Sequence, residues 1–252
     1  MASECVIEVK DLVKKFGAFM ANDHLTFSVY KGEIFGFLGA NGAGKTTALR
    51  ILSGLSKPTS GTITIAGFNV YKETEKIKKC IGYMSQKFSL YEDLTIVENM
   101  RLYGGIYSMS KKQITARTEE ILKKLQLEKQ KHSLIISLPL GIRQKLAFSV
   151  AIFHVPQIVF LDEPTGGVDP LTRRQFWELI YEATHRGITV FVTTHYMDEA
   201  EYCDRVSIMN EGKIVALDTP ENLKKHYQVQ SIHDVFLSIA RPNEKGEEDS
   251  LV

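Results

Sequence analysis

Apolar and polar residues alternate in three short stretches of the first third of the chain. Residues 6–9 and 24–30 show this pattern, and residues 62–65 form a shorter run that is closed by Gly67. A period of two residues predicts β-strands with one covered face. The N-terminal part is therefore expected to be rich in β-structure.

Other apolar runs are continuous. Residues 34–38 and 158–161 contain no charged residue, and residues 188–193 are rich in β-branched side chains. Runs of this length, bounded by turn residues, are typical of strands buried on both faces, as in parallel sheets. Residues 205–209 and 213–217 flank an Asn-Glu-Gly turn, which predicts a hairpin.

A helical period replaces the strand patterns in the middle of the chain. From about residue 94 to 130, apolar residues recur at spacings of three and four positions, which predicts helices. We interpret this region, with a further helix at 140–153, as an all-helical lobe of about residues 87–150 inserted into an α/β core. Another helix is predicted at 170–185, with Asp169 as its N-cap and proline at its first position.

A glycine-rich segment joins the apolar run at 34–38 to a predicted helix, and it fits the P-loop pattern G-x-x-x-x-G-K-[ST]. Such a loop points backbone N–H groups at phosphate oxygens, and the following helix adds partial positive charge. Lys45 is expected to reach the β- and γ-phosphates, and the Thr46 hydroxyl to hold Mg²⁺. A glycine-rich turn that happens to contain lysine is disfavoured, because strand and helix are both readable. The predicted nucleotide-binding residues are Gly39, Ala40, Asn41, Gly42, Ala43, Gly44, Lys45, Thr46 and Thr47.

Two carboxylates follow the apolar run at 158–161. Ligands of open α/β sheets bind beyond the carboxyl ends of the strands, which is where Asp162 and Glu163 stand. We expect Asp162 to face Mg²⁺ and Glu163 to polarise the water that attacks the γ-phosphate. A pair of surface acids is the alternative, and the preceding apolar run disfavours it.

Three isolated residues each have a functional and a structural interpretation. Phe16, expected in the loop between the first two strands, can stack on an adenine face or simply pack. Gln86, at the end of a predicted strand, can contact Mg²⁺ or the attacking water, or be a polar residue at a loop entrance. His195, at the end of the run at 188–193, can hydrogen-bond the γ-phosphate or be structural.

Composition limits the partners. Of the 252 residues, 44% are hydrophobic and 24% charged, which is ordinary for a soluble chain with one large domain or a core and a smaller lobe. The net charge of +1 gives no electrostatic signal for nucleic acid. The three scattered cysteines lack metal-ligand spacing. We expect neither a secretory leader nor a membrane helix, so that any membrane role would require a partner subunit.

The order of the P-loop, Gln86, Asp162-Glu163, Asp169 and His195, with a helical lobe between them, resembles the ATP-binding subunit of an ABC transporter. Residues 194–201 are most similar to ATPases of drug-resistance and ABC-2-type exporters. The resemblance implies a P-loop NTPase core with a mixed sheet, an N-terminal antiparallel β subdomain and an inserted α-helical subdomain.

The same resemblance implies a division of the chain and roles for single residues. Residues 1–226 would form the nucleotide-binding domain, and residues 227–252 a C-terminal helix and a disordered tail. Phe16 would be the adenine-stacking aromatic, and Gln86 would belong to the Q-loop. Asp169 would belong to the D-loop, and His195 would be the switch histidine.

The family resemblance also implies ligands and partners. The ligands would be ATP and Mg²⁺, and two nucleotide-binding domains would sandwich two ATP molecules. Transmembrane permease subunits would hold the chain on the cytoplasmic face of the cell membrane. The function would be an ABC-type ATPase that powers export of a drug, lipid or polysaccharide. No nucleic acid partner is expected.

The signature motif departs from the family pattern. Leu138-Pro139-Leu140-Gly141-Ile142 stands where Leu-Ser-Gly-Gly-Gln is usual, so that Pro139 replaces a serine and Leu140 a glycine. We expect the N–H groups of Gly141 and Ile142 still to face an anion on the partner domain. Ser137 is a candidate substitute for the missing hydroxyl. An active but slow ATPase is the prediction.

Two other functions fit parts of the pattern. A soluble ABC ATPase acting on ribosomes or DNA is disfavoured by the near-zero net charge and by the absence of twin domains or a long coiled-coil insertion from the sequence. A nucleotide-dependent interaction module with weak hydrolysis is suggested by Pro139. Retention of Lys45, Asp162, Glu163 and His195 argues against it.

Overall fold

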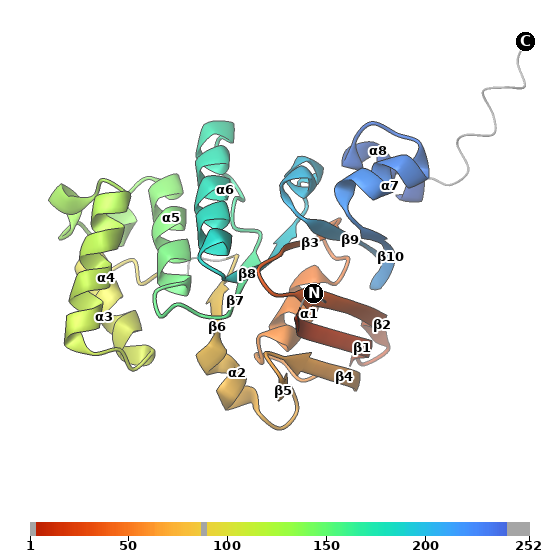
Figure 1. Cartoon of the computed structure of the whole chain (residues 1–252), viewed down its shortest axis with the longest axis horizontal. Coiled ribbons are helices and arrows are strands. Elements are labelled where there is room, and N and C mark those ends of the chain that lie inside the picture. The colour runs from red at the N-terminus through yellow and green to blue at the C-terminus, as the bar shows by residue number, and fades with distance from the viewer. Residues whose placement is uncertain (1–3, 87–89, 241–252) are drawn as a thin grey trace, which may run out of the picture.

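Two β-sheets form the core in the computed structural model, which describes residues 4–86 and 90–240. The first sheet is antiparallel, with strand order β2-β1-β4-β5 (Figure 1). Its strands are β1 (Cys5–Phe16), β2 (Phe19–Tyr30), β4 (Ser60–Ile65) and β5 (Phe68–Asn69). The predicted antiparallel subdomain is therefore present at the N-terminus.

The second sheet has the order β10-β9-β3-β8-β7-β6 and is parallel except for β10, which pairs antiparallel with β9. Its strands are β3 (Ile34–Gly39), β6 (Ile81–Met84), β7 (Ile158–Asp162), β8 (Thr189–Thr194), β9 (Arg205–Asn210) and β10 (Lys213–Asp218). The mixed sheet agrees with prediction. Strands β3, β8 and β7 are parallel, so their carboxyl ends lie at the same end of the sheet. The glycine-rich loop after β3 and the two carboxylates at the end of β7 therefore lie near each other, with one strand between them.

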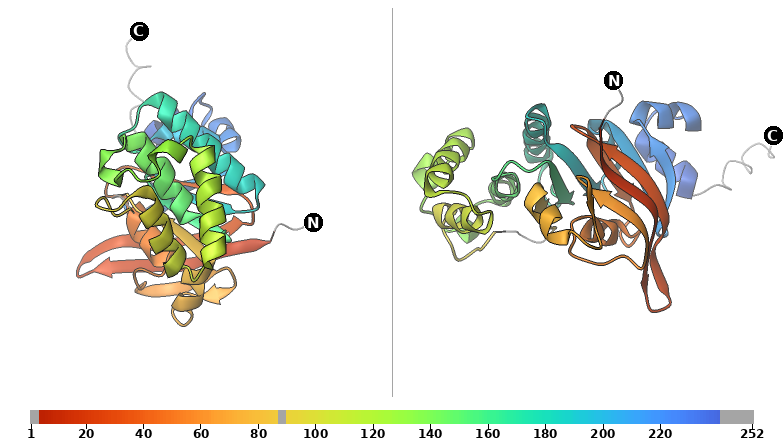
Figure 2. Two further views of the ribbon diagram at one scale, coloured as in Figure 1. Left: turned by 90° about the vertical axis from the view of Figure 1, so that its left-hand side faces the viewer. Right: turned by 60° about the horizontal axis from the view of Figure 1, so that its bottom comes forward.

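Helix α1 (Lys45–Leu52) packs between the two sheets, where Leu49 and Ile51 join one apolar cluster with Phe35 and Ile63. Helices α5 (Leu140–Ala151) and α6 (Pro170–His185) contribute to a second cluster with β7 and β8. The right-hand view of Figure 2 shows these helices between the sheets and the remaining helices of the lobe.

The helical lobe contains α3 (Ile96–Ile106) and α4 (Lys111–Lys124), followed by the short helices η1 (Glu128–Gln130) and η2 (Ile135–Ser137). Both long helices begin with a capping box, Thr95 with Glu98 and Ser110 with Gln113. These reciprocal hydrogen bonds satisfy N–H groups that the helix itself leaves open. Both helices lie within the region 94–130 that the helical period predicts. The predicted start of the lobe at residue 87 lies outside the described residues.

Short helices outside the lobe complete the described part of the chain. They are α2 (Thr74–Cys80) before β6, η3 (Met197–Tyr202) after β8, and α7 (Pro220–Tyr227) and α8 (Ile232–Ala240) after β10. Ile232 and Val235 of α8 are buried in the cluster that also contains α6. The tail predicted to be disordered lies outside the described residues beyond 240. Within the described ranges, no helix combines the length and apolar character needed to span a bilayer.

Strands β1 and β2 are longer than predicted, at 12 residues each. Asp11 (φ 58°) and His24 (φ 55°) adopt left-handed backbone, and the pairing register shifts beside them. Such bulges place an extra residue in the strand and disrupt the alternation of faces. Phe16 consequently belongs to β1, opposite Phe19, and not to a loop.

Candidate nucleotide-binding site

The glycine-rich loop lies between β3 and α1 and approaches β2 closely. Gly44 has φ 99°, and a Cβ atom there would lie 2.2 Å from the carbonyl oxygen of Ala21. Only glycine fits both conditions. Helix α1 starts at Lys45, so its first N–H groups face the loop and can bind phosphate oxygens.

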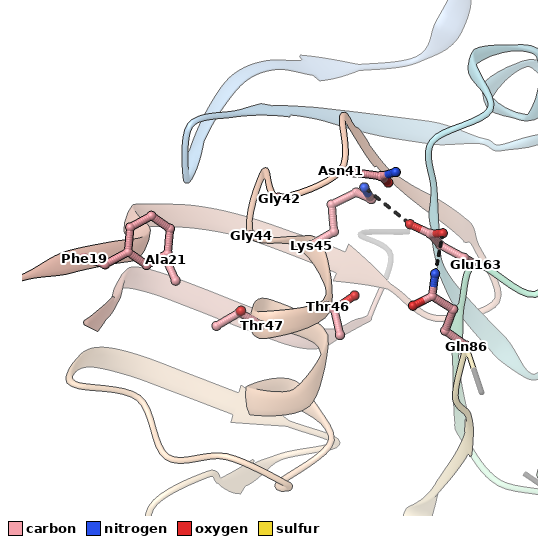
Figure 3. Close-up of a pocket in the computed structure, with 10 residues that line it drawn as sticks. All are labelled: Phe19, Ala21, Asn41, Gly42, Gly44, Lys45, Thr46, Thr47, Gln86 and Glu163. Carbon is pink, nitrogen blue, oxygen red and sulfur yellow. Dashed lines mark hydrogen bonds and ion pairs between the residues drawn. The ribbon is translucent and has the colours of Figure 1, made fainter. Parts of the chain in front are cut away.

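A cavity of about 410 Å³ opens above this loop (Figure 3). It is large enough for a small-molecule ligand. Its lining comes from β2, the loop, the end of β6 and the residue after β7. The lining residues are Phe19, Ala21, Asn41, Gly42, Gly44, Lys45, Thr46, Thr47, Gln86 and Glu163.

Lys45 is folded over the loop and is only 4% exposed. Its Nζ donates to the carbonyl oxygens of Gly39 (2.8 Å) and Ala40 (3.0 Å) and lies 3.6 Å from Glu163 Oε1. Burial lowers the pKa of Lys45, and the Glu163 carboxylate opposes that shift. The ammonium group is thus held at the cavity, where incoming phosphate oxygens can replace neutral carbonyl partners.

Asp162 ends β7 beside β8 and is 2% exposed. Its Oδ1 accepts hydrogen bonds from the hydroxyls of Thr193 (2.7 Å) and Thr46 (3.1 Å). Burial raises the pKa of Asp162, and both hydroxyls oppose that shift. The structure thereby joins α1 to β7 through two side chains that are 116 positions apart.

The donor set suits Mg²⁺. Hard cations prefer oxygen ligands, and Mg²⁺ is usually bound through one or two carboxylates together with substrate phosphates and water. Thr46 and Asp162 supply a hydroxyl and a carboxylate oxygen at hydrogen-bond distance. Among residues 4–86 and 90–240, no group of three or more His, Cys, Asp or Glu side chains could hold a metal alone. The hydroxyl of Thr46 and the carboxylate of Asp162 suit a Mg²⁺ ion whose other ligands are phosphate oxygens and water.

Glu163 is the centre of the polar contacts. Its Oε2 accepts a hydrogen bond from Gln86 Nε2 (2.9 Å) and lies 3.0 Å from His195 Nδ1, at an ion-pair distance but without good hydrogen-bond geometry. Its backbone is left-handed (φ 48°), and its N–H donates to the Thr193 carbonyl at 3.1 Å. A non-glycine residue in this region stores strain, which is common at functional sites.

The structure therefore brings together most of the residues that the sequence singled out. Lys45, Gln86 and His195 surround Glu163, with Asp162 next to it (Figure 3 shows the first two contacts). Gln86 uses its amide nitrogen on Glu163, which leaves its amide oxygen as the atom for a metal or water. The catalytic roles of these residues stay predictions.

Phe16 does not line the cavity, whereas Phe19 does. Phe16 and Phe19 are paired in the β1–β2 hairpin, and their side chains are 55% and 62% exposed. The ammonium group of Lys14 lies 4.8 Å from the centre of the Phe16 ring. Phe19 is therefore an aromatic at the cavity wall, and the prediction that Phe16 lies in a loop is wrong; the adenine-stacking role of Phe16 stays a prediction. The sequence offered no signal for this difference, because the bulges hide the strand period.

Helix α5 begins at Leu140, as predicted, and ends at Ala151, two residues before the predicted end; Pro139 is its N-cap. The Ile142 N–H donates to the Pro139 carbonyl within the chain (3.0 Å), and its role toward an anion on a partner domain stays a prediction. The Ser137 hydroxyl donates to the Leu134 carbonyl (2.7 Å), and its role as a substitute for the missing serine stays a prediction. A Cβ atom at Gly141 would lie 2.4 Å from Thr172 Cγ2, so glycine permits the close approach of α5 to α6.

Asp169 caps α6, as predicted. Its carboxylate accepts hydrogen bonds from the Thr172 N–H (3.0 Å) and hydroxyl (2.6 Å), and these contacts lower its pKa. Its side chain is thus engaged within its own chain, next to the contact between Thr172 and Gly141. Its role toward a second domain stays a prediction.

Thr193 was missed at the level of sequence. It donates to Asp162 and accepts from the Glu163 N–H through its hydroxyl (3.1 Å). In the sequence it is one more β-branched residue of an apolar strand. Knowledge of the parallel register, which pairs Asp162 with Thr193, would have identified it.

The fold and the site define a P-loop nucleotide-binding domain. A family model described as ABC transporter matches residues 22–166. The chain is 47% identical over 221 residues to the probable multidrug ABC transporter ATP-binding protein YbhF of Escherichia coli (strain K12), covering 88% of this chain and 38% of that protein. It is 38% identical to the bacitracin transport ATP-binding protein BcrA of Bacillus licheniformis, covering 87% of this chain and 72% of that protein.

Solved structures agree with these sequence relatives. The ATP-binding subunit of an ABC transporter superimposes with a TM-score of 0.84 at 29% identity and covers 93% of this chain and 99% of that one. A dimeric post-hydrolysis state of the ATP-binding cassette MJ0796, bound to ADP and Pi, superimposes with a TM-score of 0.77 at 28% identity. The match covers 84% of this chain and 98% of that chain. This chain belongs to the ABC transporter family. The predicted family, the P-loop fold and the class of ABC-type ATPase are confirmed.

Proposed function

We propose that this chain hydrolyses ATP to power an exporter. The observation that carries this proposal is the position of Glu163, which lines the cavity above the P-loop and contacts Lys45, Gln86 and His195. A domain that only bound nucleotide would not need a buried, strained carboxylate at this place.

ATP phosphates bind the loop N–H groups and take over the Lys45 ammonium from the carbonyls of Gly39 and Ala40, because charged phosphate oxygens are stronger partners than neutral carbonyls. Glu163 then accepts a proton from a water whose oxygen bonds to the γ-phosphorus. The bond from that phosphorus to the bridging oxygen breaks, and ADP leaves with the electron pair. His195 and Gln86 keep the Glu163 carboxylate oriented.

Mg²⁺ would be held by Thr46 and Asp162, with the Gln86 amide oxygen as a further ligand. Bound there, it would neutralise charge on the β- and γ-phosphate oxygens. The hydroxyl and carboxylate oxygens that support this assignment already lie within 3.1 Å of each other.

The partners that we propose are a second nucleotide-binding domain, identical or different, and transmembrane permease subunits. These subunits would place the chain at the cytoplasmic face of a cell membrane. Relatives are named for multidrug, bacitracin and Nod factor transport or export, which supports a drug, lipid or polysaccharide cargo. The chain spans only 38% of the length of YbhF, so cargo and partners are inferred from the family.

The test is phosphate release from ATP and Mg²⁺ by the full chain. We expect the wild type to be active and Glu163→Gln to lose about 10²-fold or more, because a positioned base contributes about 10²–10⁴-fold. Glu128→Gln, in η1 of the helical lobe, serves as control. Glu163→Gln should also accumulate as an ATP-bound dimer in gel filtration. An inactive wild type, assayed with its permease, would contradict the proposal.

A further inference from the structure

Glu199 is a fully buried carboxylate outside the cavity. It lies in η3, four residues after His195, and its exposed fraction is 0%. Oε1 accepts a hydrogen bond from the Thr165 hydroxyl (2.5 Å), and Oε2 accepts one from the Thr194 hydroxyl (2.6 Å). Arg173 Nε lies 3.6 Å from Oε1. All these partners are donors, so they suit an ionised carboxylate.

The partners of Glu199 come from the segments that carry the proposed catalytic residues. Thr165 follows Glu163 by two positions, and Thr194 immediately precedes His195. Arg173 belongs to α6, the helix that Asp169 caps. One carboxylate therefore connects the loop after β7, the end of β8 and α6.

His195 is also fixed from its other side. The Tyr196 N–H donates to the Thr194 hydroxyl (3.0 Å), so one hydroxyl serves both Glu199 and Tyr196. The Arg173 guanidinium lies 4.0 Å from the centre of the Tyr196 ring and pairs with Asp198 at 3.3 Å. The residues on both sides of His195 are thus tied to the surroundings of Glu199.

Burying a carboxylate is unfavourable unless donors surround it, and apolar residues would fill such a position at lower cost. We propose that Glu199 is a positioning residue for ATP hydrolysis, which sets the separation of Glu163 and His195 through Thr165 and Thr194. This inference rests on the proposed function. It assigns Glu199 no contact with nucleotide.

The first test compares Glu199→Gln with Glu201→Gln in steady-state phosphate release. Glu201 lies in the same helix, is exposed, and pairs with Lys224 (2.7 Å). We expect Glu199→Gln to lower kcat about tenfold or more, because small displacements of catalytic groups have effects of this size. KM for ATP should stay within about twofold, because the P-loop is untouched. Glu201→Gln should match the wild type.

Thr194→Val and Thr194→Ser test the same connection without altering the buried charge. Valine keeps the shape and removes the hydroxyl, whereas serine retains the hydroxyl. We expect a lower kcat in the valine variant and recovery in the serine variant, with similar unfolding midpoints. If Glu199→Gln does not fold, these two variants still test whether the contact between Thr194 and Glu199 supports ATP hydrolysis.

Three results would overturn the inference in an active wild type. They are an unchanged kcat in Glu199→Gln, equal loss of kcat in the valine and serine variants, or a loss that appears in KM alone. An inactive wild type would instead contradict the proposed function.

Discussion

At the scale of single residues, the contacts of Glu163 determine what the site can do. Lys45, Gln86 and His195 all reach this carboxylate, and its left-handed backbone turns it toward the cavity. In the mechanism that we propose, the same group pairs with the lysine before nucleotide binds and accepts a proton from water afterwards. This exchange links binding to chemistry in one side chain.

Replacing Phe19 or Phe16 by alanine is expected to change nucleotide affinity by different amounts. Stacking of a base on an aromatic ring is worth about 1–3 kcal/mol, so Phe19→Ala should weaken binding of a fluorescent ATP analogue about fivefold or more. Phe16→Ala, its partner in the hairpin, should change affinity less than about twofold. The opposite order would restore Phe16 as the stacking residue.

The signature proline predicts a slow enzyme. Pro139→Ser would supply a hydroxyl toward the partner domain, and a hydrogen bond to a charged group is worth about 1.5–3 kcal/mol. We expect faster ATP turnover in the presence of the membrane partner. Pro139→Ala restores the N–H without the hydroxyl and is the matched control. Equal turnover of wild type and Pro139→Ser would refute the argument.

At the scale of elements, capping and close packing determine the helical lobe. A Cβ atom at Gly104 would lie 2.5 Å from Ile114 Cγ1, whereas nothing lies within 4 Å of one at Gly105. Both glycines belong to α3. A substitution at Gly105 therefore reports helix propensity alone, whereas one at Gly104 also reports packing between α3 and α4.

Gly104→Ala is expected to destabilise the protein by about 1–3 kcal/mol through overpacking. Gly105→Ala should stabilise it by about 0.5–1 kcal/mol, because alanine loses less backbone entropy than glycine in a helix. Urea unfolding of both variants measures the difference. Stabilisation by both substitutions would show that Ile114 moves aside without cost.

At the scale of the whole molecule, His154 connects the lobe to the core. Its Nε2 lies 3.1 Å from the Ile81 carbonyl oxygen, and its ring stacks on Tyr107 with centroids 3.7 Å apart. Burial lowers the pKa of His154 to about 4. The imidazole therefore stays neutral in the folded protein at pH values where the unfolded chain binds a proton.

This difference predicts a dependence of stability on pH. Below about pH 6.5 the His154 imidazole is protonated in the unfolded state, whereas in the folded state it binds the proton only near pH 4. The free energy of unfolding therefore falls as the pH decreases from about 6.5 to about 4. His154→Phe keeps an aromatic ring and should lose less stability between pH 7 and pH 5. The exposed His132, changed to Gln, should leave the slope unchanged. Equal slopes for His154→Phe and wild type would contradict the assignment.

The sequence by itself determined the features that depend on neighbouring residues. The phosphate-binding loop is one contiguous segment, and Asp169 with Pro170 marks a helix start within a single turn. The continuous apolar runs also identified the buried strands, because a strand that is covered on both faces needs apolar residues at successive positions. These features need no knowledge of the rest of the chain.

Only the tertiary structure decided which side chains meet. Gln86 and Glu163 are 77 positions apart, and Thr165 and Glu199 are 34, so their contacts depend on strand order and register. The same holds for Phe19, whose place at the cavity follows from bulges in β1 and β2. Sequence periodicity reports which face of an element is covered, whereas a hydrogen bond between distant residues depends on how the elements are arranged in space.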